Sequence, residues 1–369
     1  MTRTFRHHPG DRGDSHSGNP RRLGVLLCAG LLVLGSTPVS ARPSVRDRVG
    51  MAARFIVSHQ ESDGSFPALS SDPITWTADA IVTLAAVGRG PRATRRAVEY
   101  LEASSDEIDT VGEMSKVVLA WLSIGRDPRG FMGRDLVAEV ESSQGVDGRY
   151  GSRTSVFSHS LAMLALVGAG ATQTLDAASR WLVAAQCDNG GWQFESARND
   201  LEDEHCSLGY PDIDEANTDT TSLAIQALYA LPTRVPTKHD PFVFLESLWD
   251  PANGGWSYDR STSFHSNFTS AYANANSTGM VLQAYAAAGV RPPIGSRSAL
   301  ARLQDPLCGD GAGSFAYTWQ DEEGDGAYER SGTENLAATI AAVPGLLGSE
   351  LPQVAAARRP RPRLEVCSK

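Results

Sequence analysis

Lysine is nearly missing from this chain of 369 residues: it occurs only at positions 116, 238 and 369. Acidic residues number 43 against 33 basic ones, which gives a net charge of −10. Because such a chain repels phosphate backbones and anionic lipid surfaces, we expect no nucleic-acid partner. Aromatic residues make up 7%, which is little for a cleft that stacks sugar rings and disfavours a glycosidase with paired carboxylates.

Long hydrophobic runs are scarce as well. The apolar stretch at residues 23–34 is too short to span a bilayer, so we expect no transmembrane span. It follows two arginines, Arg21 and Arg22, and precedes the small residues 39–41. This order predicts a secretory signal peptide over residues 1–41, and therefore a secreted protein. The paired arginines leave both general and twin-arginine export open.

Cysteine is sparse, and the signal peptide would remove one of the five. The remaining even number predicts two disulfides in an exported chain. Of the three pairings that four cysteines allow, we favour one that closes a loop and one that fixes the C-terminal tail. No C-x2-C or H-x3-H spacing occurs, so we expect neither a bound metal nor another cofactor. The two expected bonds are Cys187–Cys206 and Cys308–Cys367.

Repetition is what the sequence has in abundance. The pattern Gln-x3-Gly-x-aromatic occurs at residues 60–66, 144–150 and 186–192, with looser copies at 248–259 and 303–315. An apolar, alanine-rich segment of helical length follows each turn, and a more polar segment with apolar residues at i, i+3 and i+4 precedes it. A sixth apolar segment lacks the glycine turn. The apolar segments are 77–88, 109–125, 155–170, 219–231, 276–289 and 334–343, and the polar ones are 45–59, 92–104, 131–143, 173–186, 240–249 and 296–304.

Six pairs of alternating polar and apolar helices predict six helical hairpins. A helix that is apolar nearly all round must be covered on both sides, whereas an amphipathic helix needs one covered face. A ring with the apolar helices inside satisfies both requirements. We therefore expect an all-α (α/α)6 toroid over residues 42–350, followed by a Pro- and Arg-rich tail at 351–369.

We call the repeated Gln-x3-Gly-x-aromatic turn the clasp. Its glutamine ends an outer helix, where the last carbonyl groups lack partners that a side-chain amide can supply. Its glycines allow a sharp reversal, and its aromatic residue fills the seam between hairpins. We therefore interpret the clasp as structural. The residues assigned to it are Gln60, Gln144, Gln186, Trp192 and Trp256.

The clasp resembles the QW repeat of squalene-hopene cyclases, which recurs in looser form in the β subunits of protein prenyltransferases. The stretches "CDNGGWQF", "NTDTTSLAIQAL" and "NANSTGMVLQAYAAAG" look most like secreted bacterial toroid proteins that carry prenyltransferase/squalene-oxidase repeats. The resemblance covers nearly the whole chain beyond the signal peptide. It implies an α/α toroid, and it leaves the function open because the same ring serves cyclases, prenyltransferases and carriers.

In this topology the six inner helices begin at one mouth of the ring. Polar residues at these starts either cap the helices or bind a ligand in a mostly apolar cavity. We expect a binding protein, acting as a monomer, for a small or extended ligand such as an isoprenoid or a peptide. The candidate ligand-binding residues are Trp76, Asp79, Asp109, His159, Asp219, Asn276 and Asn335.

The alternative function is a terpenoid cyclase. Asp212, Asp214 and Glu215 read D-x-D-E, which resembles the D-x-D-D motif of squalene-hopene-like cyclases. By that resemblance Asp214 would protonate an alkene, provided that neighbouring groups keep it protonated. Four further residues separate the motif from the next helix, and we expect Asp219 to cap that helix. A zinc-dependent prenyltransferase is disfavoured because no suitable Asp-x-Cys pair begins a helix.

Overall fold

The structure is a computed structural model that describes residues 43–68, 73–151, 155–195, 206, 216–259, 272–321 and 327–352. The expected signal peptide and the tail beyond Pro352 lie outside these ranges. Within the described ranges, every helix falls short of the length and apolar character that crossing a membrane requires.

The outer helices are amphipathic because their apolar residues recur on one face. In α3 (Pro91–Ala103), Ala93, Ala97 and Leu101 are buried, whereas the arginines between them face solvent. Each outer helix therefore covers the ring on one side only. The outer helices are α1 (Val45–Ser58), α3, α5 (Leu136–Ser142), α7 (Leu175–Ala184), α9 (Pro241–Ser247) and α11 (Ser296–Arg302).

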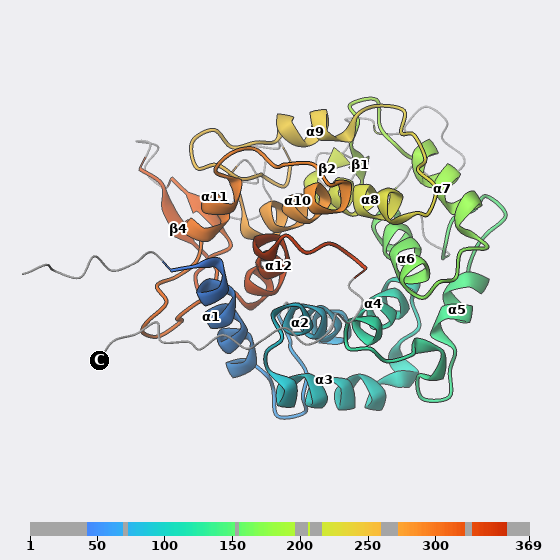
Figure 1. Ribbon diagram of the computed structural model, residues 1–369, viewed down its shortest axis with the longest axis horizontal. Coiled ribbons are helices and arrows are strands. Elements are labelled where there is room, and N and C mark those ends of the chain that lie inside the picture. Colours follow the sequence, from blue (N-terminus) through green and yellow to red (C-terminus); the bar gives the residue numbers. More distant parts are fainter. Residues whose placement is uncertain are drawn as a thin grey trace, which may run out of the picture. The chain divides into compact units, whose positions relative to one another are not determined.

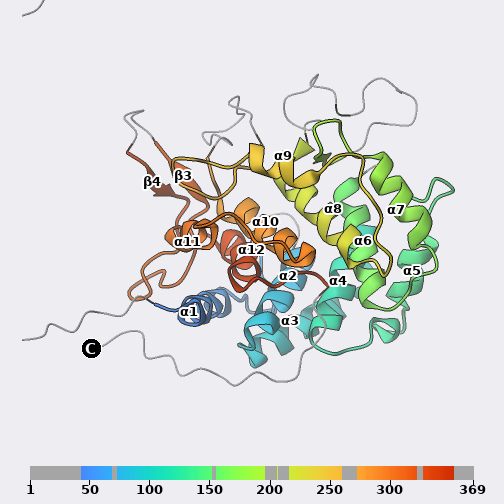
Figure 2. The ribbon, with the colours of Figure 1, turned by 45° about the horizontal axis from the view of Figure 1, so that its top comes forward.

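The inner helices are buried on nearly every side. In α8 (Thr218–Ala230), every residue from Thr220 to Leu228 is buried. Each inner helix contacts the next one in order, and α12 contacts α2, so the inner ring closes on itself (Figures 1 and 2). The predicted α/α toroid of six hairpins is thereby confirmed. The inner helices are α2 (Pro73–Val87), α4 (Val111–Ser123), α6 (Val156–Gly168), α8, α10 (Ala275–Ala288) and α12 (Leu336–Leu347).

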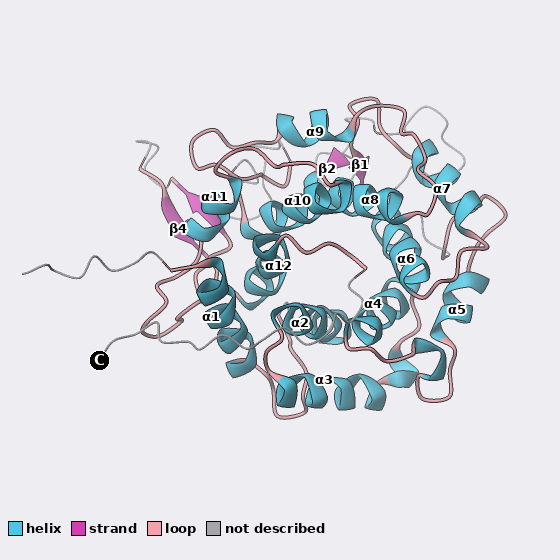
Figure 3. Ribbon diagram, in the orientation of Figure 1, coloured by secondary structure: helices cyan, strands magenta, loops and turns pink. Residues whose placement is uncertain are grey.

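Short strands join some of the turns at the mouth (Figure 3). Strand β1 (Trp192–Gln193) pairs antiparallel with β2 (Ala216–Asn217), and β3 (Thr318–Gln320) pairs antiparallel with β4 (Glu329–Ser331). The first pair begins at the aromatic residue of a clasp and ends at the residue before α8. It therefore fixes the point at which that inner helix enters the ring.

In the four clasps that contain a glutamine, its side chain links two outer helices. Gln186 Nε2 donates to the carbonyl of Gly190 in its own turn, at 2.8 Å, and to the carbonyl of His239 before α9, at 3.0 Å. Gln60 and Gln144 make the same two bonds to their own glycines and to α3 and α7. Gln304 bonds Gly313 and Arg48 of α1 in this way, so the last clasp closes the outer ring.

The aromatic residue of each clasp is held by the inner helix that follows. The backbone N–H of Trp192 donates to Thr221 Oγ1 at 2.9 Å. In four clasps the acceptor is a threonine, and in the remaining one it is Nδ1 of His159, which accepts from Tyr150 N–H at 3.1 Å. The threonine acceptors are Thr77, Thr221, Thr278 and Thr339.

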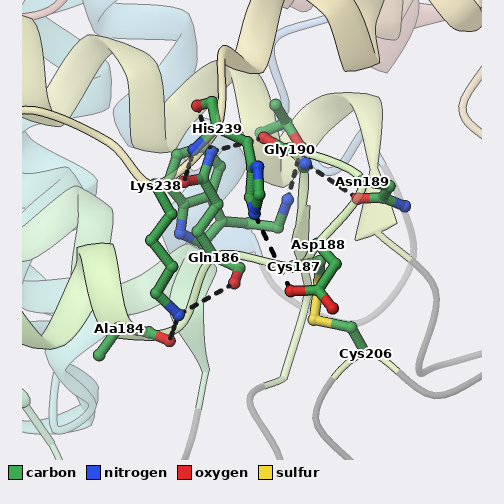
Figure 4. Close-up of a disulfide and its surroundings, with 12 residues drawn as sticks. Ala184, Gln186, Cys187, Asp188, Asn189, Gly190, Cys206, Lys238 and His239 are labelled. Carbon is green, nitrogen blue, oxygen red and sulfur yellow. Dashed lines mark hydrogen bonds and ion pairs between the residues drawn. A yellow bond between two sulfur atoms is a disulfide. The ribbon is translucent and has the colours of Figure 1, made fainter.

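A disulfide joins Cys187 to Cys206, as expected. It lies beside Gln186 in the same clasp, where Lys238 Nζ also donates to the carbonyl of Ala184 (Figure 4). Cys308 is disulfide-bonded as well. Its expected partner Cys367 lies outside the described residues, so that pairing remains a prediction.

The double variant Cys187→Ala/Cys206→Ala is expected to lower the free energy of unfolding by about 3 kcal/mol. The bond joins residues 19 positions apart, and a loop of that length restricts the unfolded chain by roughly this amount. Urea denaturation of oxidised wild type and variant measures the difference. Reduced wild type is the control and should lose at least as much, because the bond of Cys308 opens too. A loss below about 1 kcal/mol would contradict the prediction.

Candidate functional site

The inner ring encloses a cavity of about 290 Å³. Helix α8 contributes Asp219, Leu223 and Gln226 to its wall, at positions i, i+4 and i+7. These positions lie on one face of a helix. Helix α10 repeats the arrangement one hairpin later with Asn276, Met280 and Gln283. The two helices therefore present matching polar–apolar–polar stripes, with one polar group near the mouth and one deeper in the ring.

The opposite wall carries an ion pair and apolar side chains. Lys116 Nζ of α4 lies 2.6 Å from Asp79 Oδ2 of α2 and 5.6 Å from the centre of the Trp76 ring. Because the pair neutralises itself, it adds little net charge to the cavity. The remaining lining is mostly apolar and includes Val82, Leu119, Phe157, Leu161, Ile340 and Pro344.

Three of the residues that line this cavity each carry a polar side-chain atom without a hydrogen-bond partner among the described residues. These atoms are Asp219 Oδ1, Asn276 Oδ1 and Gln226 Nε2, and each exposes less than 1 Å². A buried polar group without a partner costs about 1–3 kcal/mol. Such atoms are therefore expected to bind water or a ligand. The set offers two acceptors near the mouth and one donor deeper in the ring.

The carboxyl group of Asp219 is the most perturbed acid of the cavity. Burial raises its pKa to about 6, and the charge of Asp259 adds to the rise, while a hydrogen bond from Ser277 opposes it. The residue as a whole is half-buried, and its Oδ1 exposes less than 1 Å². Asp219 does not cap α8 as expected: Asn217 does, by accepting from Thr220 N–H at 2.9 Å.

The structure brings together only some of the residues that the sequence proposed for the mouth. Trp76, Asp79, Asp219 and Asn276 line the cavity. The other three, Asp109, His159 and Asn335, do not line it.

Each of those three lies in another setting. Asp109 is exposed before α4, where its backbone N–H donates to Glu113 Oε2. His159 is buried in the clasp, where its Nε2 also contacts the carbonyl of Ala178, and desolvation lowers its pKa to about 4. Asn335 caps α12 by accepting from Ala338 N–H at 2.8 Å.

Sequence reasoning missed Gln226, Gln283 and Lys116, which all line the cavity. A signal for both glutamines was present in "DTTSLAIQAL" and "NSTGMVLQAY". Each glutamine follows the polar residue of the mouth by seven positions, which is two helical turns on the same face. No comparable pattern marks the lysine.

The residues of the cyclase alternative, Asp212, Asp214 and Glu215, lie outside the described residues. Across the ranges that are described, no group of three or more His, Cys, Asp or Glu side chains could hold a metal ion.

Solved structures share this fold at low sequence identity. A protein from Actinoplanes is 15% identical, with a TM-score of 0.54 over 83% of this chain and 99% of its own. An α-1,6-mannanase from Salegentibacter is 14% identical, with a TM-score of 0.53 over 82% of this chain and 100% of its own. A type II terpene cyclase from Scytonema, in complex with geranylgeranyl dihydroxybenzoate, is 13% identical, with a TM-score of 0.53 over 82% of this chain and 97% of its own.

These likenesses show the α/α toroid and assign no function, because unrelated chemistries occur on one fold. No model of a known protein family matches the sequence, and no curated protein matches it significantly.

Proposed function

We propose that this protein is an exported binding protein that holds one compact, mostly apolar molecule in the central cavity. The ligand carries a hydrogen-bond donor such as a hydroxyl group at the mouth and an oxygen acceptor at its deeper end. The observation that supports this proposal is the set of three buried polar atoms without partners in one cavity. A concave, mostly apolar site with a few convergent polar groups is the usual form of a small-molecule site.

The spacing of the polar atoms sets the size of the ligand. Asp219 and Gln226 are seven residues apart on α8, which corresponds to about 10 Å along the helix. A volume of about 290 Å³ holds on the order of ten water-sized groups. A chain of about eight carbons with an oxygen at each end meets both limits, whereas squalene is too large for this cavity.

We also propose that the chain is a secreted QW-repeat toroid protein. The shared hydrogen bonds of the four clasp glutamines support the repeat. The signal-peptide pattern at residues 1–41 and the disulfide support export.

The variant Asn276→Leu is expected to weaken the binding of octanediol, with a hydroxyl at each end, by about fivefold. One hydrogen bond is lost, worth about 1 kcal/mol. Stability should stay the same or rise, because Asn276 Oδ1 has no partner in the fold. Isothermal titration calorimetry measures the binding and chemical denaturation the stability.

Asn335→Ala is the matched control. It removes the cap of α12, so it should cost about 1 kcal/mol of stability and leave binding unchanged. Equal octanediol affinity in wild type and Asn276→Leu would contradict the proposed contact. Native mass spectrometry of protein purified from its own host would then identify the natural ligand through any retained molecule.

A second candidate function is acid catalysis by Asp219, as in a terpenoid cyclase. The raised pKa of this carboxyl favours it, because a group that titrates near 6 can still donate a proton close to neutral pH. The proton donor would then be Asp219 and not Asp214. Cyclised product formed from a linear terpenoid by wild type and lost in Asp219→Asn would establish this function in place of simple binding.

A further inference from the structure

The chain that follows α12 crosses the inner ring. Helix α12 ends at Leu347 with Gly348 as its C-cap, and the residues Ser349–Pro352, which we call the strap, run from there toward α6 (Figure 1). Helices α12 and α6 are three places apart in a ring of six, so they lie opposite each other. The strap therefore spans the ring at the end where the inner helices finish.

The strap is attached to three inner helices. Ser349 N–H donates to the carbonyl of Pro344 in α12 at 3.0 Å. Leu351 N–H donates to Gln226 Oε1 of α8 at 3.0 Å. Pro352 packs against Gly168 of α6 so closely that a side-chain carbon at Gly168 would come within 2.8 Å of it.

The side chain of Leu351 is part of the cavity wall. Asp219 and Asn276, in the first turns of α8 and α10, mark the mouth. Gln226, which holds Leu351, is near the end of α8. Leu351 therefore lies at the far end of the cavity from the mouth, beside the unpartnered Nε2 of the same glutamine.

We propose that the strap is the floor of the ligand site and that Leu351 sets the maximum length of the ligand. The inference rests on the proposed binding function and sharpens it. A cavity that is closed at one end accepts a compact molecule that enters at the mouth and stops against Leu351. It excludes an extended peptide or glycan that would thread through the ring.

Calorimetric titration with two linear diols of different length tests this proposal on the full-length protein. Wild type should bind octanediol at least about tenfold more tightly than dodecanediol, because overpacking a closed cavity opposes the longer chain. In Leu351→Ala the preference should fall to about one or reverse. Leu347→Ala is the matched control, because Leu347 is half-buried at the end of α12 and is not part of the cavity wall. It should keep the wild-type preference.

A second variant tests the floor in a protein whose stability is unchanged, in case Leu351→Ala folds poorly. Leu351→Phe fills more of the floor and should weaken octanediol by about tenfold while the melting temperature stays close to wild type. The same diol preference in wild type and both Leu351 variants would overturn the role of the floor while leaving the binding function intact. Failure of wild type to bind either diol would overturn the binding function, and the floor proposal with it.

Discussion

Replacing Trp192 by alanine is expected to lower the free energy of unfolding by about 3–5 kcal/mol, as truncation of a buried tryptophan does. The side chain is fully buried in the core formed by several hairpins. Its Nε1 donates to the carbonyl of Leu182 at the end of α7, at 2.7 Å, and its backbone N–H is held by Thr221 of α8. The variant therefore loses the packing of the buried ring and the Nε1 bond to α7, whereas the backbone bond to Thr221 remains.

Phe194→Ala provides the comparison, because Phe194 lies two positions further on and is 39% exposed. It should cost less than about 1.5 kcal/mol. Urea denaturation of both variants, followed by far-ultraviolet circular dichroism, measures the two losses. Similar small losses in both would show that the clasp aromatic is not part of the core. Under conditions in which Trp192→Ala is fully folded, its octanediol binding should equal that of wild type, since this residue is not part of the cavity wall.

The fold could be predicted because the hydrophobic pattern that encodes it is local and repeated six times. An amphipathic segment followed by a uniformly apolar one has few packing solutions, and a closed ring satisfies both. The clasp spacing added the position of each turn. The copy at 303–315 was recognised as a looser clasp, but Gln304 was not among the residues assigned to it, because an insertion separates it from Gly313; it makes the same two bonds as the other clasp glutamines.

The site was harder to predict because a polar residue at the start of an inner helix has three competing roles. It can cap the helix, as Asn217 and Asn335 do, or hold a clasp, as His159 does, or face the cavity, as Asp219 and Asn276 do. These roles differ by one or two positions along the helix, which rotates a side chain by more than a quarter turn. The precise start of each helix therefore decides the role, and sequence patterns place helix ends less accurately than that.

The floor of the cavity could not be foreseen either. Leu351 reaches Gln226 across 125 positions of sequence, and no periodicity connects a segment after the last helix with the centre of the ring. The sequence placed it at the beginning of an extended tail. Only the three-dimensional course of the chain shows that the strap closes the cavity.

The second large effect is expected at the clasp glycines, whose backbone conformation the turn requires. Gly148 has a φ of 92°, and a Cβ there would lie 2.5 Å from the carbonyl oxygen of Ala177 in α7. A β-branched residue at such a φ is strained by about 1–3 kcal/mol, and overpacking against α7 adds about 1–3 kcal/mol. Gly148→Val should therefore lower the free energy of unfolding by about 4 kcal/mol.

Gly295→Val separates the two causes of that loss. Gly295 has nearly the same φ, 93°, but a Cβ there would meet no atom within 4 Å. It should therefore show only the backbone strain, about 1–3 kcal/mol. The difference between the two variants, measured by chemical denaturation under one set of conditions, isolates the close approach of the clasp to α7. If the two losses are equal, the clasp turn is not packed against the next outer helix. That outcome would contradict the structure, in which Gln144 donates to the carbonyls of both Gly148 and Thr174 and so holds the turn against the start of α7.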